Sequence, residues 1–180
     1  MELSFPYTAA QRHSQRIRHM NTHETTAVQG GAQPLARYSA WRRAGDLILM
    51  SGVIAVDPVA GRIVRGFDDI PEDAARLIGK TGEFSSDIKD GPILAQSWHV
   101  LDSIRRNIEA AGGQMSDVVK LVQYFRHLDH FPRYSSVRKL FFPGQPPAST
   151  VVEVSAMLPT ADILIEVEAT AWLPERAAKV

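Results

Sequence analysis

The stretch "PPASTVVEVSAMLPTADILIEVEATAW", residues 146–172, decides the fold, because it contains two strand-like runs separated by a short turn. Successive side chains of a strand point to opposite faces of its sheet. One face of the second run, Ile163–Trp172, is therefore wholly aliphatic and is expected to meet helices: Ile163, Ile165, Val167, Ala169 and Ala171. The other face carries two carboxylates, Glu166 and Glu168, flanked by a leucine and a tryptophan.

The first run, residues 149–157, also alternates between a dry face and a mixed face. The dry face holds Thr150, Val152, Val154 and Ala156, and the mixed face holds Ser149, Val151, Glu153 and Ser155. The simplest interpretation is that the mixed faces meet water, because glutamate is seldom buried. However, the run "LILMSGVIAV" (47–56) is apolar on both sides, and a sheet with two apolar faces needs cover on both. We therefore expect a second subunit over the glutamates, whose raised pKa would suit proton transfer.

Outward from this stretch, periodicity defines the other elements. The clearest helix is "ILAQSWHVLDSIRRNIEAAGG", whose apolar residues recur at steps of three and four before a Gly-Gly stop. The expected order is strand-strand-strand-helix-strand-helix-strand-strand, over residues 37–41, 46–56, 63–67, 93–113, 118–128, 129–142, 149–157 and 163–172. This order predicts an α+β fold in which two helices pack on one face of a mixed sheet.

Three further segments complete the domain organisation. Residues 1–33 are polar without apolar periodicity, so we expect a flexible N-terminal tail, and Met20 is an alternative start. The domain itself spans 34–174 and is followed by a short tail at 175–180. Residues 68–92 are rich in Gly, Asp and Ser, which predicts an inserted surface excursion with one short helix near Pro71–Ile78.

Composition excludes several classes of function. The chain has 20 basic and 20 acidic residues, which argues against a nucleic-acid binder or a polybasic membrane anchor. The absence of cysteine excludes disulfides and thiolate chemistry and fits the cytoplasm, where we expect the protein. His127 and His130 lie three residues apart, but no further ligand converges on them, so we expect no metal and no cofactor.

Three blocks resemble the RidA (YjgF, reactive-intermediate deaminase) superfamily. They are "GDLILMSGVIAVDPVAGRIV", "LDSIRRNIEAAGGQMSDVVKLVQYFRHLDHF" and the opening stretch, in the family's order. The resemblance implies a chorismate-mutase-like fold and a homotrimer whose sheets line a central barrel. It also implies clefts between subunits that bind a small-molecule ligand.

Active members of this family hydrolyse enamines and imines such as 2-aminoacrylate. The resemblance makes Glu166 the catalytic residue that handles the attacking water. The substrate-binding positions that it implies are Tyr38, Gly52, Ser135, Ser149 and Val151. At the position of Ser149 the family has an arginine that binds the substrate carboxylate, and a serine cannot supply that charge.

The missing arginine leaves two functions open. The first is a RidA-like hydrolase or deaminase acting on a small imine, enamine or related metabolite other than 2-aminoacrylate. The second is a non-enzymatic trimer that binds small ligands or protects other proteins. The two differ in whether another arginine reaches Ser149, and the candidates are Arg37, Arg126, Arg133 and Arg138.

Overall fold

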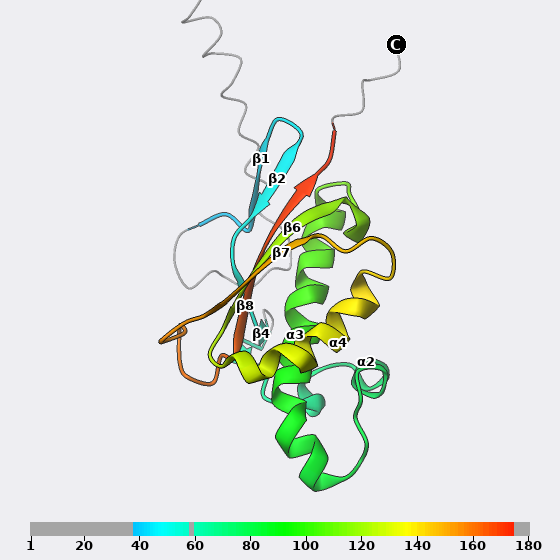
Figure 1. Cartoon of the computed structure of the whole chain (residues 1–180), viewed down its shortest axis with the longest axis vertical. Helices are drawn as coiled ribbons and strands as arrows, with labels where there is room; N and C mark the ends of the chain where they lie inside the picture. Colours follow the sequence, from blue (N-terminus) through cyan, green and yellow to red (C-terminus); the bar gives the residue numbers. More distant parts are fainter. Residues whose placement is uncertain (1–37, 58–59, 175–180) are drawn as a thin grey trace, which may run out of the picture.

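The computed structural model describes residues 38–57 and 60–174, so the tails expected at 1–33 and 175–180 lie outside the described residues. Within these ranges, six strands form one sheet. Five of them follow the order β1-β2-β8-β6-β7 (Figure 1), and β3 also pairs with β8. The strands are β1 (Trp41–Ala44), β2 (Leu47–Met50), β3 (Val53–Ile54), β6 (Val118–Phe125), β7 (Ala148–Glu153) and β8 (Ile165–Trp172). Among the described strands of this sheet only β6 and β7 are parallel, which confirms a mixed sheet.

Two short strands form a separate hairpin, β4 (Val56–Asp57) with β5 (Arg62–Ile63). The long apolar run therefore contributes three strands instead of one. It breaks at Ser51 and Gly52, which lie between β2 and β3. A glycine inside a strand-like run is typical of such an interruption.

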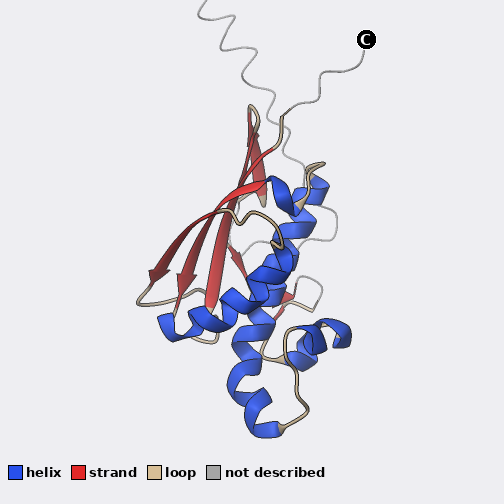
Figure 2. Cartoon of the chain, turned by 45° about the vertical axis from the view of Figure 1, so that its right-hand side comes forward, coloured by secondary structure: helices blue, strands red, loops and turns tan. Residues whose placement is uncertain are grey.

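The helices lie on one side of the sheet (Figure 2). They are α2 (Glu72–Leu77), α3 (Phe84–Ala110) and α4 (Phe131–Phe141), with 3-10 turns η1 (Phe67–Asp69), η2 (Met115–Asp117) and η3 (Leu128–His130). Helix α3 packs on both β8 and α4. No helix in the described part of the chain has the length and apolarity required to cross a membrane.

The alternation of the last strand is confirmed. Ile165, Val167 and Ala171 are fully or almost fully buried, and they belong to one core cluster with Leu101 and Ile104 of α3. Burying an aliphatic side chain of this size contributes about 1.5–3 kcal/mol. This face of β8 therefore fixes the sheet against α3 and leaves Glu166 and Glu168 on the open face.

The expected orientation of the preceding strand is wrong. In the β6–β7 register, Ser149 pairs with Leu121 and Val151 pairs with Gln123, and both partners on β6 are fully buried on the helix side. The mixed face of β7 therefore turns toward the helices. The dry face turns to the open side of the sheet, where its Val152 is 37% exposed. The physical reason is that Val151 packs against the core on this face, while Arg138 of α4 and Gln123 of β6 form hydrogen bonds with Ser149.

The segment 68–92 is more regular than a surface excursion. Its short helix matches α2, but α3 begins at Phe84 and runs through Pro92. The carboxylate of Asp87 accepts hydrogen bonds from the backbone of Thr81 and Gly82, which fixes the turn before this helix. Gly91 allows the helix to lie against Phe67, because a Cβ there would be 3.1 Å from the ring.

Candidate active site

Glu166 lies on the open face of β8, opposite Ile54 of β3 and Tyr124 of β6. Gly52 makes room for its carboxylate, since a Cβ at this position would lie 1.8 Å from Glu166 Oε1. Tyr38 also lies near Glu166. Burial raises the pKa of the Tyr38 phenol, and the charge of the Glu166 carboxylate raises it further. The structure thus brings together three of the six residues singled out in the sequence.

The environment of Glu166 favours proton transfer. Burial, and then the charge of Glu168, raises the pKa of Glu166 above its ordinary value. Glu168 itself accepts a hydrogen bond of 3.1 Å from the Tyr124 hydroxyl. No group in the described ranges donates a hydrogen bond to Glu166. Its carboxylate oxygens can therefore accept a hydrogen bond from water.

The second group of residues lies on the other face of the sheet. Arg138 of α4 donates from Nη1 to Ser149 Oγ at 3.1 Å, and the Ser149 hydroxyl donates to Gln123 Oε1 at 3.0 Å. Arg138 Nη1 also approaches Gln123 Oε1 at 3.5 Å. A guanidinium therefore lies beside Ser149, at the position where the family resemblance places a positive charge.

The other two candidate arginines among the described residues point elsewhere. Arg126 donates to the backbone oxygens of Val154 and Ser155. Arg133 forms an ion pair with Asp90 at 3.1 Å. Arg37 lies outside the described residues. Of the three described candidates, Arg138 alone reaches Ser149.

The two remaining predicted residues belong to this second group. Val151 pairs with Gln123 and packs against the core. Ser135 is half-buried on α4, three residues before Arg138 and so on a neighbouring part of the same helix surface. Glu166, Gly52 and Tyr38 thus form one group, and Ser149, Val151 and Ser135 belong to another. One chain does not bring the two groups together.

Sequence analysis did not single out Gln123. This residue is fully buried in β6, between the apolar positions Leu121 and Phe125 of the same face. A glutamine at a core-facing position of a strand needs a hydrogen-bonding partner when buried. The pattern "LVQYF" therefore contained the signal, and the partners are Ser149 and Arg138.

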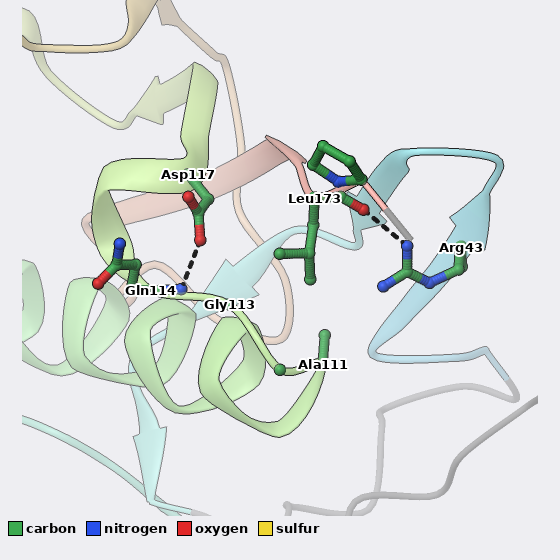
Figure 3. A pocket seen from close by; sticks show the side chains of 8 residues that line it. Arg43, Ala111, Gly113, Gln114, Asp117 and Leu173 are labelled. Atoms are coloured by element: carbon green, nitrogen blue, oxygen red, sulfur yellow. Dashed lines mark hydrogen bonds between the residues drawn. The ribbon is translucent and has the colours of Figure 1, made fainter. Parts of the chain in front are cut away.

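A pocket of about 600 Å³ lies elsewhere, beyond the end of α3 (Figure 3). None of the six predicted residues lines it. Its polar groups hold local structure, because Arg43 donates to Leu173 O at 2.8 Å and Asp117 accepts from Gln114 N at 2.8 Å. The candidate site therefore rests on the two sheet faces and not on this pocket.

Comparisons with known proteins show the family of the chain and agree with its fold. The family model "Endoribonuclease L-PSP" matches residues 30–173. A RutC family protein of Pyrococcus horikoshii is 31% identical, and the alignment covers 83% of this chain and 97% of that protein. The 2-iminobutanoate/2-iminopropanoate deaminase of Escherichia coli is 29% identical, with 82% and 96% covered.

A solved structure from Klebsiella pneumoniae, described as a candidate endoribonuclease, is 69% identical with a TM-score of 0.74. The match covers 76% of this chain and all of that one. The structure of RidA from a Psychrobacter species shares the fold at a TM-score of 0.65 and 22% identity. With the family model matching most of its length, the chain belongs to the RidA superfamily, to which the Endoribonuclease L-PSP model refers.

Proposed function

We propose that this protein is a hydrolase that deaminates a small imine or enamine, with Glu166 as the residue that handles water. The observation that supports this most strongly is the position of Glu166. Its carboxylate is half-buried, has a raised pKa and lies against a glycine that leaves space for it. A carboxylate tuned in this way can act as a general base near neutral pH.

The chemistry requires one water and no cofactor. The substrate reacts as the protonated imine. The Glu166 carboxylate takes a proton from water as the water oxygen bonds to the imine carbon, which gives a neutral carbinolamine. Protonated Glu166 then returns this proton to the nitrogen. As the carbon–nitrogen bond breaks, the carbinolamine hydroxyl gives its proton to the Glu166 carboxylate, and the products are a carbonyl compound and ammonia, which takes up that proton as ammonium. An enamine first takes a proton from solvent water at carbon, which converts it to the protonated imine.

The names of relatives support this class of reaction. The relatives from Escherichia coli and Dermatophagoides farinae are both named 2-iminobutanoate/2-iminopropanoate deaminase. Other relatives carry the name endoribonuclease, but this chain has 20 basic and 20 acidic residues, so we do not propose RNA as its substrate.

The proposed enzyme works as a homotrimer with its sites between subunits. Two observations support this arrangement. The site residues lie on opposite faces of the sheet, so each group needs a partner from another chain. The open face also exposes large apolar side chains, namely Leu47, Leu49, Val152 and Trp172. Three such sheets would close a central barrel, and each stable interface would bury more than about 1,000 Å².

We further propose that the substrate differs from 2-aminoacrylate. A serine at residue 149 takes less volume than an arginine, and the nearby guanidinium comes from α4 instead of β7. The side of the site next to β7 is therefore expected to accept a bulkier substituent.

The test measures ammonia release from imino acids generated in situ from amino acids of increasing side-chain size. We expect turnover with a preference for larger side chains, and a loss of roughly a hundred- to ten-thousandfold in Glu166→Gln. The near-isosteric glutamine should leave thermal unfolding unchanged or slightly raised. Ammonia release that is unaffected by Glu166→Gln would refute the proposed role of this residue. Binding of small keto acids without any turnover would favour the non-enzymatic trimer.

A further inference from the structure

Arg138 carries a positive charge that lacks an anionic partner among the described residues. Its side chain is half-buried, and no carboxylate in the described ranges forms an ion pair with it. Its only hydrogen bonds to residues that the structure describes, Ser149 and Gln123, use Nη1. The Nε and Nη2 groups therefore remain available as the two-pronged edge that binds a carboxylate.

The side chain of Gln123 is oriented for this guanidinium. Gln123 Oε1 accepts hydrogen bonds from both Ser149 and Arg138, while its buried Nε2 has no partner among the described residues. A guanidinium has donors only, so it requires the amide oxygen and not the amide nitrogen on its side. The amide oxygen thus accepts from the arginine, and this orientation leaves the amide nitrogen without a partner among the described residues.

The Tyr134 ring supports the same guanidinium from α4. Arg138 Cζ lies 5.9 Å from the ring centroid, within the range of a cation–π contact. Tyr134 is itself fully buried against Phe125, so it provides a rigid base. Contacts from α4, β6 and β7 therefore hold the charge in one place beside Ser149.

We propose that Arg138 is the anion-binding residue of this protein, and that Ser149 and Gln123 position its guanidinium. The ligand is a carboxylate, and in the proposed function, on which this inference rests, it is the carboxylate of the imino or enamino acid. The positive charge absent from residue 149 on β7 is thus supplied by residue 138 on α4. This arrangement leaves the Ser149 position small while keeping the charge.

The experiment separates anion binding from turnover. Binding of pyruvate, 2-oxobutanoate and phenylpyruvate is measured by calorimetry on the full chain, together with binding of their neutral amides. We expect Arg138→Gln to weaken binding of the acids roughly ten- to a hundredfold, as for loss of a charged hydrogen bond, and to leave the amides nearly unchanged. Arg138→Lys keeps the charge but loses the fork, so an intermediate loss is expected.

Three controls keep the result specific. Lys139→Gln removes a positive charge from the adjacent exposed position of α4 and should have no effect. Ser149→Ala removes a positioning contact, so it should raise KM with little change in kcat. Arg138→Gln combined with Ser149→Arg returns the charge to β7 and should restore binding of the smallest acid, pyruvate, more than that of phenylpyruvate.

The outcomes distinguish the inference from the proposed function. Acid binding that is unchanged in Arg138→Gln, while Glu166→Gln abolishes ammonia release, would overturn the role of Arg138 and leave the function standing. Acid binding lost in Arg138→Gln, with no turnover of any imine by the wild type, would keep the anion site and overturn the enzyme. Failure of the wild type to bind any of the three acids would overturn the anion site.

Discussion

The two groups of site residues differ in how the chain builds them. The open face holds the first group, namely Glu166, Gly52 and Tyr38. Strand register places Glu166, and the absence of a side chain at Gly52 leaves space for its carboxylate. Arg138 and Ser149 lie on the helix face, where hydrogen bonds between side chains of three elements hold the site. The first group is determined mainly by the backbone and the second by side chains.

Because of this difference, the two groups tolerate different kinds of substitution. A group that depends on the backbone fails when any atom fills the space that a glycine leaves. A group that depends on side chains can move a charge from one element to another while the charge stays near the same point. The substitution of arginine by serine at residue 149 is therefore compatible with an intact anion site, because Arg138 is within 3.1 Å of the serine.

The largest expected effect comes from dissociating the proposed trimer, which would leave the two groups of each site on separate monomers. Leu49 is 45% exposed on the open face, and in the proposed trimer it is covered by a neighbouring subunit. Leu49→Arg would place three like charges in that interface, so we expect light scattering to give the mass of one chain, 19.9 kDa, instead of three. Ammonia release should fall with it.

The control for this change is a residue on the helix side. Leu77 of α2 is 65% exposed and lies outside the open face, so Leu77→Arg should leave both the mass and the activity unchanged. A wild-type protein that is monomeric at micromolar concentration would contradict the trimer. In that case the two groups of residues could not form one site.

The second prediction tests the dependence of the Glu166 group on the backbone. In Gly52→Ala the new Cβ would lie 1.8 Å from Glu166 Oε1, so the carboxylate must move. Because a misplacement of about 1 Å can cost roughly a hundredfold, we expect kcat to fall by about that factor while binding of keto acids is retained. Gly144→Ala is the matched control, because a Cβ there meets no atom within 4 Å. Equal activity of the two variants would show that the glycine is not required.

The sequence predicted the elements that local periodicity determines. The face of β8 followed from alternation, and α4 (Phe131–Phe141) lies within the helix expected at 129–142. The first turns of α3 did not, because their glycine, proline and serine residues favour a loop until Phe67 packs against Gly91. Tertiary contact outweighs local preference at that end of the helix.

The part of the site that could be predicted is the part whose geometry depends on a glycine. The proximity of Gly52 to Glu166 follows from strand pairing, so the family pattern was sufficient to place them together. Which arginine reaches Ser149 depends on the packing of α4 against β6 and β7, and a long side chain can reach in several directions. Only the three-dimensional structure could show that Arg138, and neither Arg126 nor Arg133, reaches Ser149.

The smallest expected effect is a shift in pH dependence that belongs to the Glu166 group alone. If the ionised carboxylate is the base, activity is present above the pKa of Glu166 and is lost as the pH falls through it. Burial is the main cause of the raised pKa, and the neighbouring charge of Glu168 adds to it. Glu168→Gln removes that charge and keeps an acceptor for the Tyr124 hydroxyl, so the pKa of Glu166 should fall and the acidic limb of the kcat profile should move to lower pH.

Glu83→Gln removes an exposed carboxylate at the start of α3 and should leave the limb in place. The Arg138 variants should change KM without moving this limb, because their group lies on the other face of the sheet. A limb that stays fixed in Glu168→Gln, or moves to higher pH, would mean that a different group carries the proton.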